Sequence, residues 1–124
     1  MSVLSHTLLI FHGSARESAS NAAVAFAAEL SSKRDCSDFS ICFLKGAEPD
    51  LTLAITNAIA KGYKKLLLLP LFLLPGAHIS EDIPAVVDKF KSSNPEVAFQ
   101  VCDCLTHNPQ FIEFVSNQIA SVRD

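Results

Sequence analysis

Apolar residues alternate between two patterns along the chain. The first pattern is a short, nearly continuous apolar run, which is typical of a parallel strand that is covered on both faces. Four runs of this kind occupy residues 7–11, 39–44, 65–73 and 97–102. In the second pattern, apolar residues recur at steps of three and four, as on one face of a helix. Four segments of this kind occupy residues 19–30, 51–59, 79–90 and 111–122. The chain is therefore expected to form four strand–helix units.

Residues at the segment ends support this division. Asp50 is expected to cap the second helix, and Gly62 lies just past the end of that helix. Ser80 is expected to cap the third helix. Asn108 and Pro109 form a cap followed by a proline at the first helical position of the last helix.

Four strand–helix units predict an α/β fold, a three-layer sandwich in (βα)₄ arrangement around a four-stranded parallel sheet. The strand order 2-1-3-4, that of a flavodoxin-like core, is the natural one for four units. Pro70 cannot donate a hydrogen bond to a neighbouring strand, so we expect it at a strand end or at a bulge.

Composition limits the classes of function. The chain has 124 residues, the size of one domain, which we place at residues 1–124. Apolar residues make up 49% of the chain, which excludes an intrinsically disordered protein. The formal net charge of −3 argues against a nucleic-acid partner, which needs a basic surface. The longest apolar run, residues 66–77, falls short of the roughly 20 residues that a membrane span requires.

The N-terminus and the cysteines suggest a cytoplasmic protein. Residues 1–6 contain neither the basic region nor the small-residue cleavage site of a signal peptide, so no targeting segment is expected. No two cysteines have C-x-x-C spacing. We expect reduced, structural thiols at Cys36, Cys42, Cys102 and Cys104.

The predicted topology identifies a site. Ligands of open parallel sheets bind beyond the carboxyl ends of the strands, where the strand order reverses. Here the reversal falls between the first and third strands, which are followed by His12 and His78. Two imidazoles are therefore expected in one crevice. Ser14 is also placed to form a capping box with Glu17, which would give it a structural role instead.

The other two histidines are weaker candidates. His6 precedes the first strand, at the opposite end of the sheet, and His107 follows the fourth strand as a peripheral contact. The sequence contains neither a phosphate-binding G-x-x-x-x-G-K-[ST] motif nor a dinucleotide-binding G-x-G-x-x-G motif. It also lacks the G-x-S-x-G nucleophile motif. Phe11 stands where a phosphohistidine phosphatase would need an arginine.

Two segments resemble signatures of the small sirohydrochlorin chelatases, which are class II chelatases. Residues 8–14, which end in His-Gly-Ser, resemble the first-strand motif of that family. Residues 72–84 resemble the second signature, an apolar strand followed by Gly-x-His and then Asp-Ile-Pro. The second segment is fairly specific, and the resemblance spans essentially the whole chain.

The resemblance implies insertion of a divalent metal ion into sirohydrochlorin without ATP. Co²⁺ is the expected ion, with Fe²⁺ and Ni²⁺ as alternatives, and no permanently bound cofactor is implied. Neutral imidazole binds such ions and accepts protons near neutral pH. His12 and His78 would divide metal binding and proton removal, and the sequence leaves open which histidine does which.

The flat, carboxylate-edged substrate suggests further contacts. Apolar Phe11, Leu74 and Pro75 would face the ring, while Arg16 or Lys45 would meet its carboxylates. The full set of expected substrate contacts is Phe11, Gly13, Ser14, Arg16, Lys45, Leu74, Pro75 and Gly76. The chain also departs from the family. Phe11 replaces a glycine, and Lys45 stands where many members have an acidic residue, for which Glu48 is an alternative.

Two other functions fit the same residues. Lys45 in place of an acid suits a non-catalytic tetrapyrrole or metal carrier on the same fold. An unrelated flavodoxin-like interaction domain, in which both histidines are structural, is the third interpretation.

The resemblance also implies a homodimer. Long members of the family carry two such domains in one chain, so a short member is expected to pair with itself. The expected contact is either the apolar face of the last helix, around Phe111 and Val115, or the apolar loop at residues 72–75. Alternatively, both segments pack on their own sheet.

Overall fold

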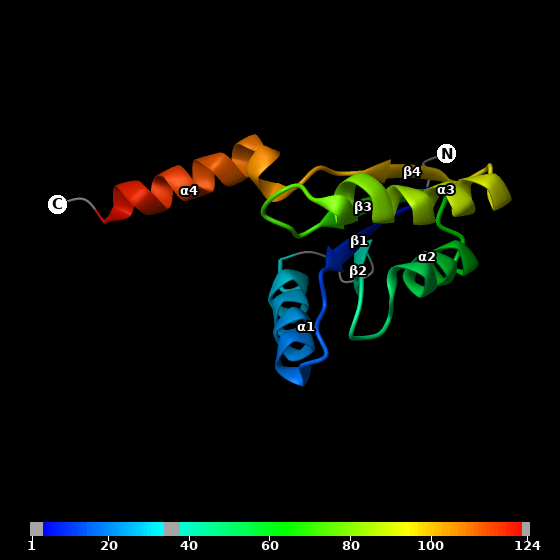
Figure 1. Ribbon diagram of the computed structural model, residues 1–124, viewed down its shortest axis with the longest axis horizontal. Helices are drawn as coiled ribbons and strands as arrows, with labels where there is room; N and C mark the ends of the chain where they lie inside the picture. The colour runs from blue at the N-terminus through cyan, green and yellow to red at the C-terminus, as the bar shows by residue number, and fades with distance from the viewer. Residues whose placement is uncertain (1–3, 34–37, 123–124) are drawn as a thin grey trace.

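A parallel sheet organises the molecule. The computed structural model describes residues 4–33 and 38–122. The four strands lie in the order β2-β1-β3-β4, with all neighbouring pairs parallel, which confirms the predicted topology (Figure 1). The strands are β1 (Ser5–Phe11), β2 (Phe39–Phe43), β3 (Lys65–Pro70) and β4 (Ala98–Val101).

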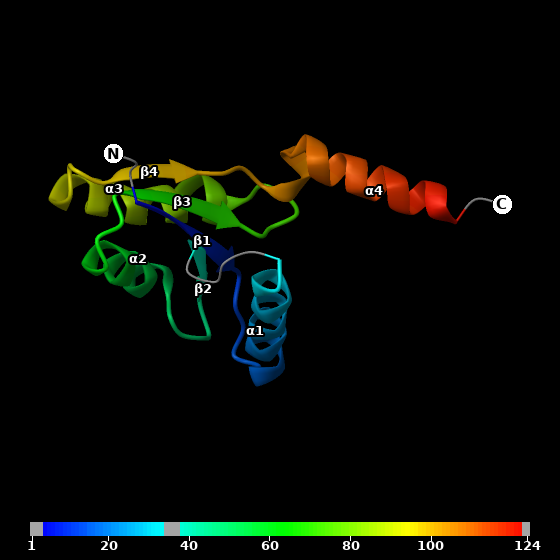
Figure 2. The ribbon, with the colours of Figure 1, turned by 180° about the vertical axis from the view of Figure 1, so that it is seen from behind.

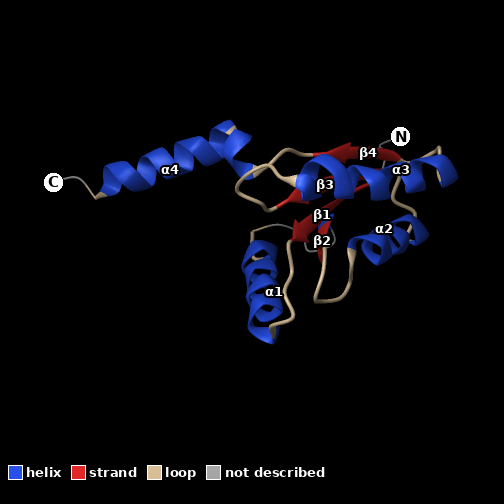
Figure 3. Ribbon diagram, viewed as in Figure 1, coloured by secondary structure: helices blue, strands red, loops and turns tan. Residues whose placement is uncertain are grey.

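Helices follow each strand, as the apolar spacing predicts (Figure 3). They are α1 (Glu17–Ser31), α2 (Leu51–Ala60), α3 (Ile83–Ser93) and α4 (Pro109–Ser121). A π-helical turn, η2 (His78–Asp82), leads into α3, and a 3₁₀ turn, η3 (Leu105–His107), leads into α4. The two turns lengthen the connections at the carboxyl end of the sheet, where the predicted site lies.

The main core lies between the sheet and helices α2 and α3. Side chains that alternate along β1 and β3 point into it and are fully buried, among them Leu8, Ile10, Leu66 and Leu68. Helix α1 packs on the opposite face, where the rings of Phe11 and Phe26 meet edge to face at 6.2 Å between centroids. Burying one large apolar side chain stabilises a fold by roughly 1.5–3 kcal/mol, so this two-sided packing fixes the sheet on which the site is built.

Three of the predicted helix-end signals are confirmed, and so is the predicted position of Pro70 at a strand end. The Asp50 carboxylate accepts a hydrogen bond from the Leu53 amide at 2.8 Å, and the Asn108 side chain accepts one from the Gln110 amide at 2.8 Å. Gly62 has φ = 94° just past α2. Pro70 is the last residue of β3, as its missing N–H predicts.

Two capping predictions are wrong. Ser80 lies inside η2, where its hydroxyl donates to the Gly76 carbonyl at 3.0 Å, so it does not cap α3. Ser14 does not form a capping box, because α1 begins after Arg16 and the Ser14 hydroxyl accepts from the Arg16 amide at 3.1 Å. In both cases the hydroxyl is used inside the turn that precedes the helix, so it is not available to cap the helix.

Helix α4 departs from the layered arrangement. It runs away from the sheet, so that the C-terminal end of α4 lies far from the other helices (Figures 1 and 2). None of its residues is buried within the part of the chain that the structure describes.

No helix among residues 4–33 and 38–122 is long and apolar enough to cross a membrane. Cys42, Cys102 and Cys104 are free thiols, and Cys36 lies outside the described residues. Burial raises the pKa of the Cys42 thiol to about 12, and the nearby Asp50 carboxylate adds to this effect.

Candidate metal and tetrapyrrole site

Two histidines meet at the carboxyl end of the sheet, as the topology predicts. His12 follows β1, and His78 opens η2 after the adjacent strand β3. Their ring centroids lie 4.7 Å apart, with the rings inclined at 78°. Phe72 lies beside both, with ring centroids at 5.9 Å from His12 and 6.4 Å from His78. Imidazole is a common ligand of divalent metal ions, so two imidazoles this close make the pair a candidate site for one ion.

Asp82 orients His78. Its carboxylate accepts a hydrogen bond from Nδ1 of His78 at 2.7 Å, four residues back along η2. A proton held at Nδ1 leaves the lone pair of Nε2 available for a metal ion or a proton. Carboxylates commonly orient metal-binding histidines in this way. The sequence analysis did not identify Asp82 as a site residue, although its spacing from His78 places the two side chains on one helical face.

Two glycines let the loops after β1 and β2 cross at contact distance. Gly13 has φ = 87°, and a Cβ there would collide with the carbonyl oxygen of Lys45. Gly46 has φ = 76°, and a Cβ there would collide with the Ser14 backbone. The crossing holds Lys45 close to the His12 loop. The sequence analysis did not single out Gly46.

A cavity of about 280 Å³ opens beside His78. Its charged and titratable lining consists of Lys45, Asp50, His78 and Asp82. Lys45 therefore lies in the same cavity as His78, together with two carboxylates. Glu48, the other candidate for the acidic position, is exposed and does not line this cavity.

The remaining predicted contacts are exposed or half-buried. Leu74 is 68% exposed, and Pro75 and Gly76 are exposed beside it in the loop that leads to His78. Arg16 is exposed at the start of α1, and Ser14 is half-buried. The Phe11 ring points towards α1 and contacts Phe43, with ring centroids 5.9 Å apart.

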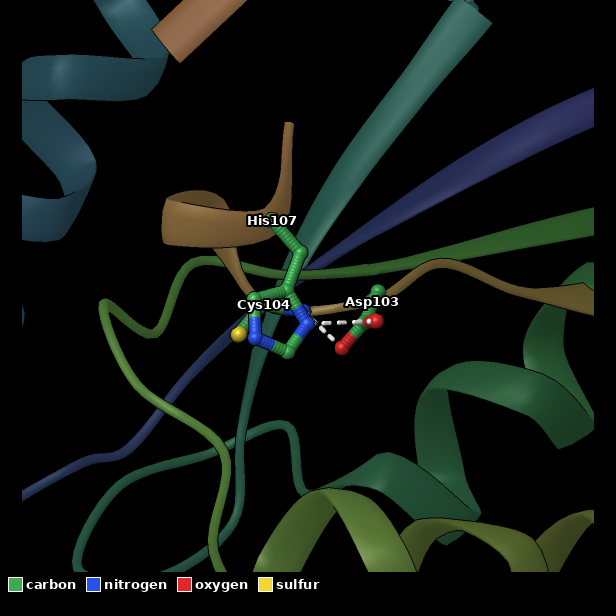
Figure 4. A group of neighbouring side chains, drawn as sticks. All are labelled: Asp103, Cys104 and His107. Atoms are coloured by element: carbon green, nitrogen blue, oxygen red, sulfur yellow. Dashed lines mark hydrogen bonds and ion pairs between the residues drawn. The ribbon is translucent and has the colours of Figure 1, made fainter. Parts of the chain in front are cut away.

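A second histidine–carboxylate pair lies on the loop after β4. Nδ1 of His107 donates to the Asp103 carboxylate at 2.8 Å, and Figure 4 shows the imidazole between that carboxylate and the Cys104 sulfur. One ligand atom from each of these three residues lies within 4.8 Å of the others. Hydrogen bonds from His107 and from the Cys104 amide lower the pKa of Asp103. Aspartate, cysteine and histidine are all metal ligands in proteins, but Cys104 is buried and the other two side chains are exposed.

The model of the CbiX family matches residues 6–122, nearly the whole chain. The chain belongs to the CbiX family. Among curated proteins, a sirohydrochlorin ferrochelatase of Priestia megaterium is 31% identical over 90 residues, which cover 73% of this chain and 34% of that protein. A sirohydrochlorin cobaltochelatase of the same organism is 36% identical over 58 residues, covering 47% of this chain and 19% of that protein.

A third curated relative is nearer to this chain in length. A sirohydrochlorin cobaltochelatase of Saccharolobus islandicus is 32% identical over 80 residues, which cover 64% of this chain and 61% of that protein. The matched part of the chain thus spans less than two thirds of the length of each of these curated relatives.

Solved structures share the fold. The crystal structure of a putative cobalamin biosynthesis CbiX protein from Marinobacter aquaeolei superposes with a TM-score of 0.77 at 20% identity, covering 94% of this chain and 95% of the other. SirB from Bacillus subtilis with Fe³⁺ gives a TM-score of 0.80 at 22% identity and covers 98% of this chain but 48% of SirB. This CbiX-family chain therefore has the fold of nearly the whole Marinobacter protein and of about half of SirB.

Proposed function

We propose that this CbiX-family chain inserts a divalent metal ion into sirohydrochlorin without ATP. The observation that carries the proposal is the pair of imidazoles 4.7 Å apart at the carboxyl end of the sheet, with Asp82 holding one of them. The curated relatives carry the names cobaltochelatase and ferrochelatase, which agrees with this chemistry.

Metal insertion must replace water on the ion and remove two protons from the pyrrole nitrogens. Because Asp82 holds the proton of His78 at Nδ1, we assign Nε2 of His78 to the metal ion. Among the described residues, His12 has no such carboxylate, and its ring makes only a long hydrogen bond, 3.4 Å, from Nδ1 to the neighbouring Gly13 carbonyl. We therefore assign proton removal to His12, since neutral imidazole accepts protons near pH 6.5.

The substrate ring would lie over the exposed loop at Leu74, Pro75 and Gly76, which offers apolar surface next to His78. Lys45 lines the cavity beside His78 and would meet a ring carboxylate, a role that Arg16 shares from the start of α1. Gly13 and Ser14 would contribute backbone contacts, and Phe11 would support this loop from below through Phe43.

Co²⁺ is the ion we propose, with Fe²⁺ and Ni²⁺ as further substrates. All three are first-row divalent ions that imidazole binds, so the two histidines alone do not separate them. Asp50 and Asp82 add negative charge to the cavity and would attract any of these ions, while Lys45 opposes that attraction.

We also propose that the working unit is a homodimer. One copy presents a single wall to a macrocycle, whereas binding sites for small molecules usually bury most of their ligand. A twofold partner would supply a second copy of the same wall.

The assay is direct. Purified protein is mixed with metal-free sirohydrochlorin and with Co²⁺, Fe²⁺ or Ni²⁺ in turn, and the visible spectrum is followed against the uncatalysed reaction. The proposal expects faster insertion with at least one ion. Binding of sirohydrochlorin without any acceleration would instead identify a carrier. A protein that neither binds sirohydrochlorin nor accelerates insertion would contradict any function in tetrapyrrole chemistry.

A further inference from the structure

The loop after β4 brings three different metal-ligating side chains together. Asp103 and His107 are four residues apart, and Cys104 and His107 are three apart, around the turn η3. Side chains at these spacings lie on one side of a helical turn. One ligand atom from each residue lies within 4.8 Å of the other two, and Figure 4 shows the imidazole between the carboxylate and the sulfur. The proposed insertion at His12 and His78 uses none of these three side chains.

Both oxygens of the Asp103 carboxylate are already positioned. Oδ1 accepts a hydrogen bond from the Cys104 amide at 2.7 Å, and Oδ2 accepts one from Nδ1 of His107 at 2.8 Å. A metal ion bound to Oδ2 would leave the bond from the amide to Oδ1 in place. Carboxylates that bind metal ions are usually held by such an outer hydrogen bond, so this part of a metal site is present before any ion binds.

The Cys104 thiol has a defined position and a proton to lose. The residue is 1% exposed, and its Sγ lies 3.6 Å from Oγ1 of Thr106. Because the Thr106 hydroxyl donates to the Leu73 carbonyl at 2.6 Å, the thiol is the donor in its contact with Thr106. A thiol that binds a metal ion gives up this proton. The thiolate and the Asp103 carboxylate then carry two negative charges, and a neutral His107 carries none, which matches a divalent cation.

Small movements of exposed side chains would close the cluster around one ion. Ligand distances of about 2.1 Å for nitrogen and oxygen and about 2.3 Å for sulfur place the ligand atoms of a tetrahedral zinc site about 3.5 Å apart. The ligand atoms here already lie within 4.8 Å of one another, so movements of about 1 Å suffice. The side chains of His107 and Asp103 are 51% and 60% exposed, so both can rotate towards the buried sulfur.

We propose that Asp103, Cys104 and His107 bind one Zn²⁺ ion, which is separate from the ion that is inserted. Thiolate ligands favour zinc among the common divalent ions, and carboxylate and imidazole are also zinc ligands. His12 and His78 offer no sulfur, so the two sites differ in the ions they prefer. Three protein ligands leave the fourth position of a tetrahedral zinc ion to water.

The bound ion would stabilise the fold at the point where two loops meet. The amide of Leu105 donates to the Phe72 carbonyl at 2.8 Å, and the amide of Thr106 donates to the Leu73 carbonyl at 3.1 Å. An ion that ties together residues on both sides of these bonds holds η3 against the loop after β3. Because an unfolded chain does not keep the three ligands together, the ion binds the folded form and stabilises it. No step of metal insertion passes through this site, so the proposal does not depend on the proposed function.

Cadmium provides a direct spectroscopic test, because Cd²⁺ substitutes for Zn²⁺ and a Cd²⁺–thiolate bond gives an ultraviolet charge-transfer band. Histidine and carboxylate ligands give no such band. Titration of the metal-free protein with Cd²⁺ is expected to give a band that saturates at one ion per chain and is removed by competing Zn²⁺. The double variant His12→Ala/His78→Ala is expected to give the same band, since the histidine pair contributes no sulfur.

Two variants and a matched control assign the ligands. Cys104→Ser is expected to abolish the band, whereas Cys102→Ser, which changes a cysteine two residues earlier, is expected to keep it. His107→Ala is expected to raise the dissociation constant for Cd²⁺ about a hundredfold or more, because losing even an outer partner of a metal ligand costs about 10–100-fold. The exposed position of His107 keeps the test decisive if Cys104→Ser does not fold.

Thermal unfolding measures the stabilisation. In the His12→Ala/His78→Ala variant, where the histidine pair is absent, Zn²⁺ is expected to raise the unfolding midpoint. Adding Cys104→Ser or His107→Ala to that variant is expected to abolish the rise, because the ion then has no complete site in the folded protein.

Four results would overturn the zinc site. These are the absence of a Cd²⁺ band, a band that persists in Cys104→Ser, an unchanged Cd²⁺ affinity in His107→Ala, and an unfolding midpoint that Zn²⁺ does not raise. The proposed function fails separately: a protein that binds Cd²⁺ through Cys104 and His107 but does not accelerate insertion into sirohydrochlorin would contradict the chelatase proposal and leave the zinc site intact.

Discussion

At the scale of single residues, Asp82 gives the two histidines different roles. Both rings come from loops at the same sheet edge, but of the two only His78 has a described carboxylate on Nδ1. The pairing of His12 with His78 is predictable from topology, because parallel neighbours end at one edge. The role of Asp82 is not, because a first-turn aspartate is equally expected from the helix dipole alone.

Asp82→Asn tests this orientation. The amide accepts a weaker hydrogen bond from His78, so the affinity for Co²⁺ is expected to fall about 10–100-fold, the usual effect of losing such a partner. Titration calorimetry with Co²⁺ alone measures this. Asp103→Asn is the matched control, because it changes the carboxylate of the second histidine–carboxylate pair, which has the same four-residue spacing and lies on the loop after β4. Equal affinities in wild type and Asp82→Asn would contradict the assigned role of Asp82.

A prediction about pH follows from the hydrogen bond between Asp103 and His107. The hydrogen bond from His107 lowers the pKa of Asp103 in the folded protein. The stability that the ionised Asp103 contributes is therefore fully present above the ordinary pKa of an aspartate. It is lost as the pH falls through the lowered pKa of Asp103 in the folded protein. Carboxyl NMR titration is expected to show a low pKa that moves back up in His107→Ala. An unchanged pKa in that variant would show that His107 is not the cause.

At the scale of elements, the crossing of the loops after β1 and β2 decides where the site residues lie. Sequence analysis locates both loops, because each follows a clear apolar run. It does not detect their contact, because residues 13 and 46 are far apart in the chain and only their backbone geometry shows the need for glycine. The same holds for η2, whose wide turn takes Ser80 away from the predicted cap position.

Three glycine-to-alanine variants distinguish the backbone strain of a positive φ from the steric collision of an added Cβ atom. Gly46→Ala is expected to lower the free energy of unfolding by more than about 3 kcal/mol, because it adds a collision with the Ser14 backbone to the strain of a positive φ. Gly62→Ala, at φ = 94° but in open space, is expected to lose only about 1–2 kcal/mol. Gly76→Ala has neither feature and is expected to change little. Urea unfolding measures all three, and equal losses at positions 46 and 62 would contradict the close crossing.

At the scale of the whole molecule, the (βα)₄ order follows from the sequence because apolar runs and amphipathic segments alternate without exception. The position of α4 does not follow, since an apolar stripe has the same spacing whether the helix packs on its own sheet or on a partner's. The hydrogen bonds from Leu105 and Thr106 to the loop after β3 decide its direction, and they have no signature in the sequence.

The central claim is that His12 and His78 together carry out metal insertion. The most direct measurement is the rate of Co²⁺ insertion into sirohydrochlorin by His12→Ala and His78→Ala, with His107→Ala as the matched control outside the pair. Both site variants are expected to be folded and to lose at least about tenfold in rate, because each loses a ligand or a proton acceptor. His107→Ala is expected to insert the ion at the wild-type rate. Folded His12→Ala and His78→Ala proteins that both insert Co²⁺ as fast as the wild type would contradict the account.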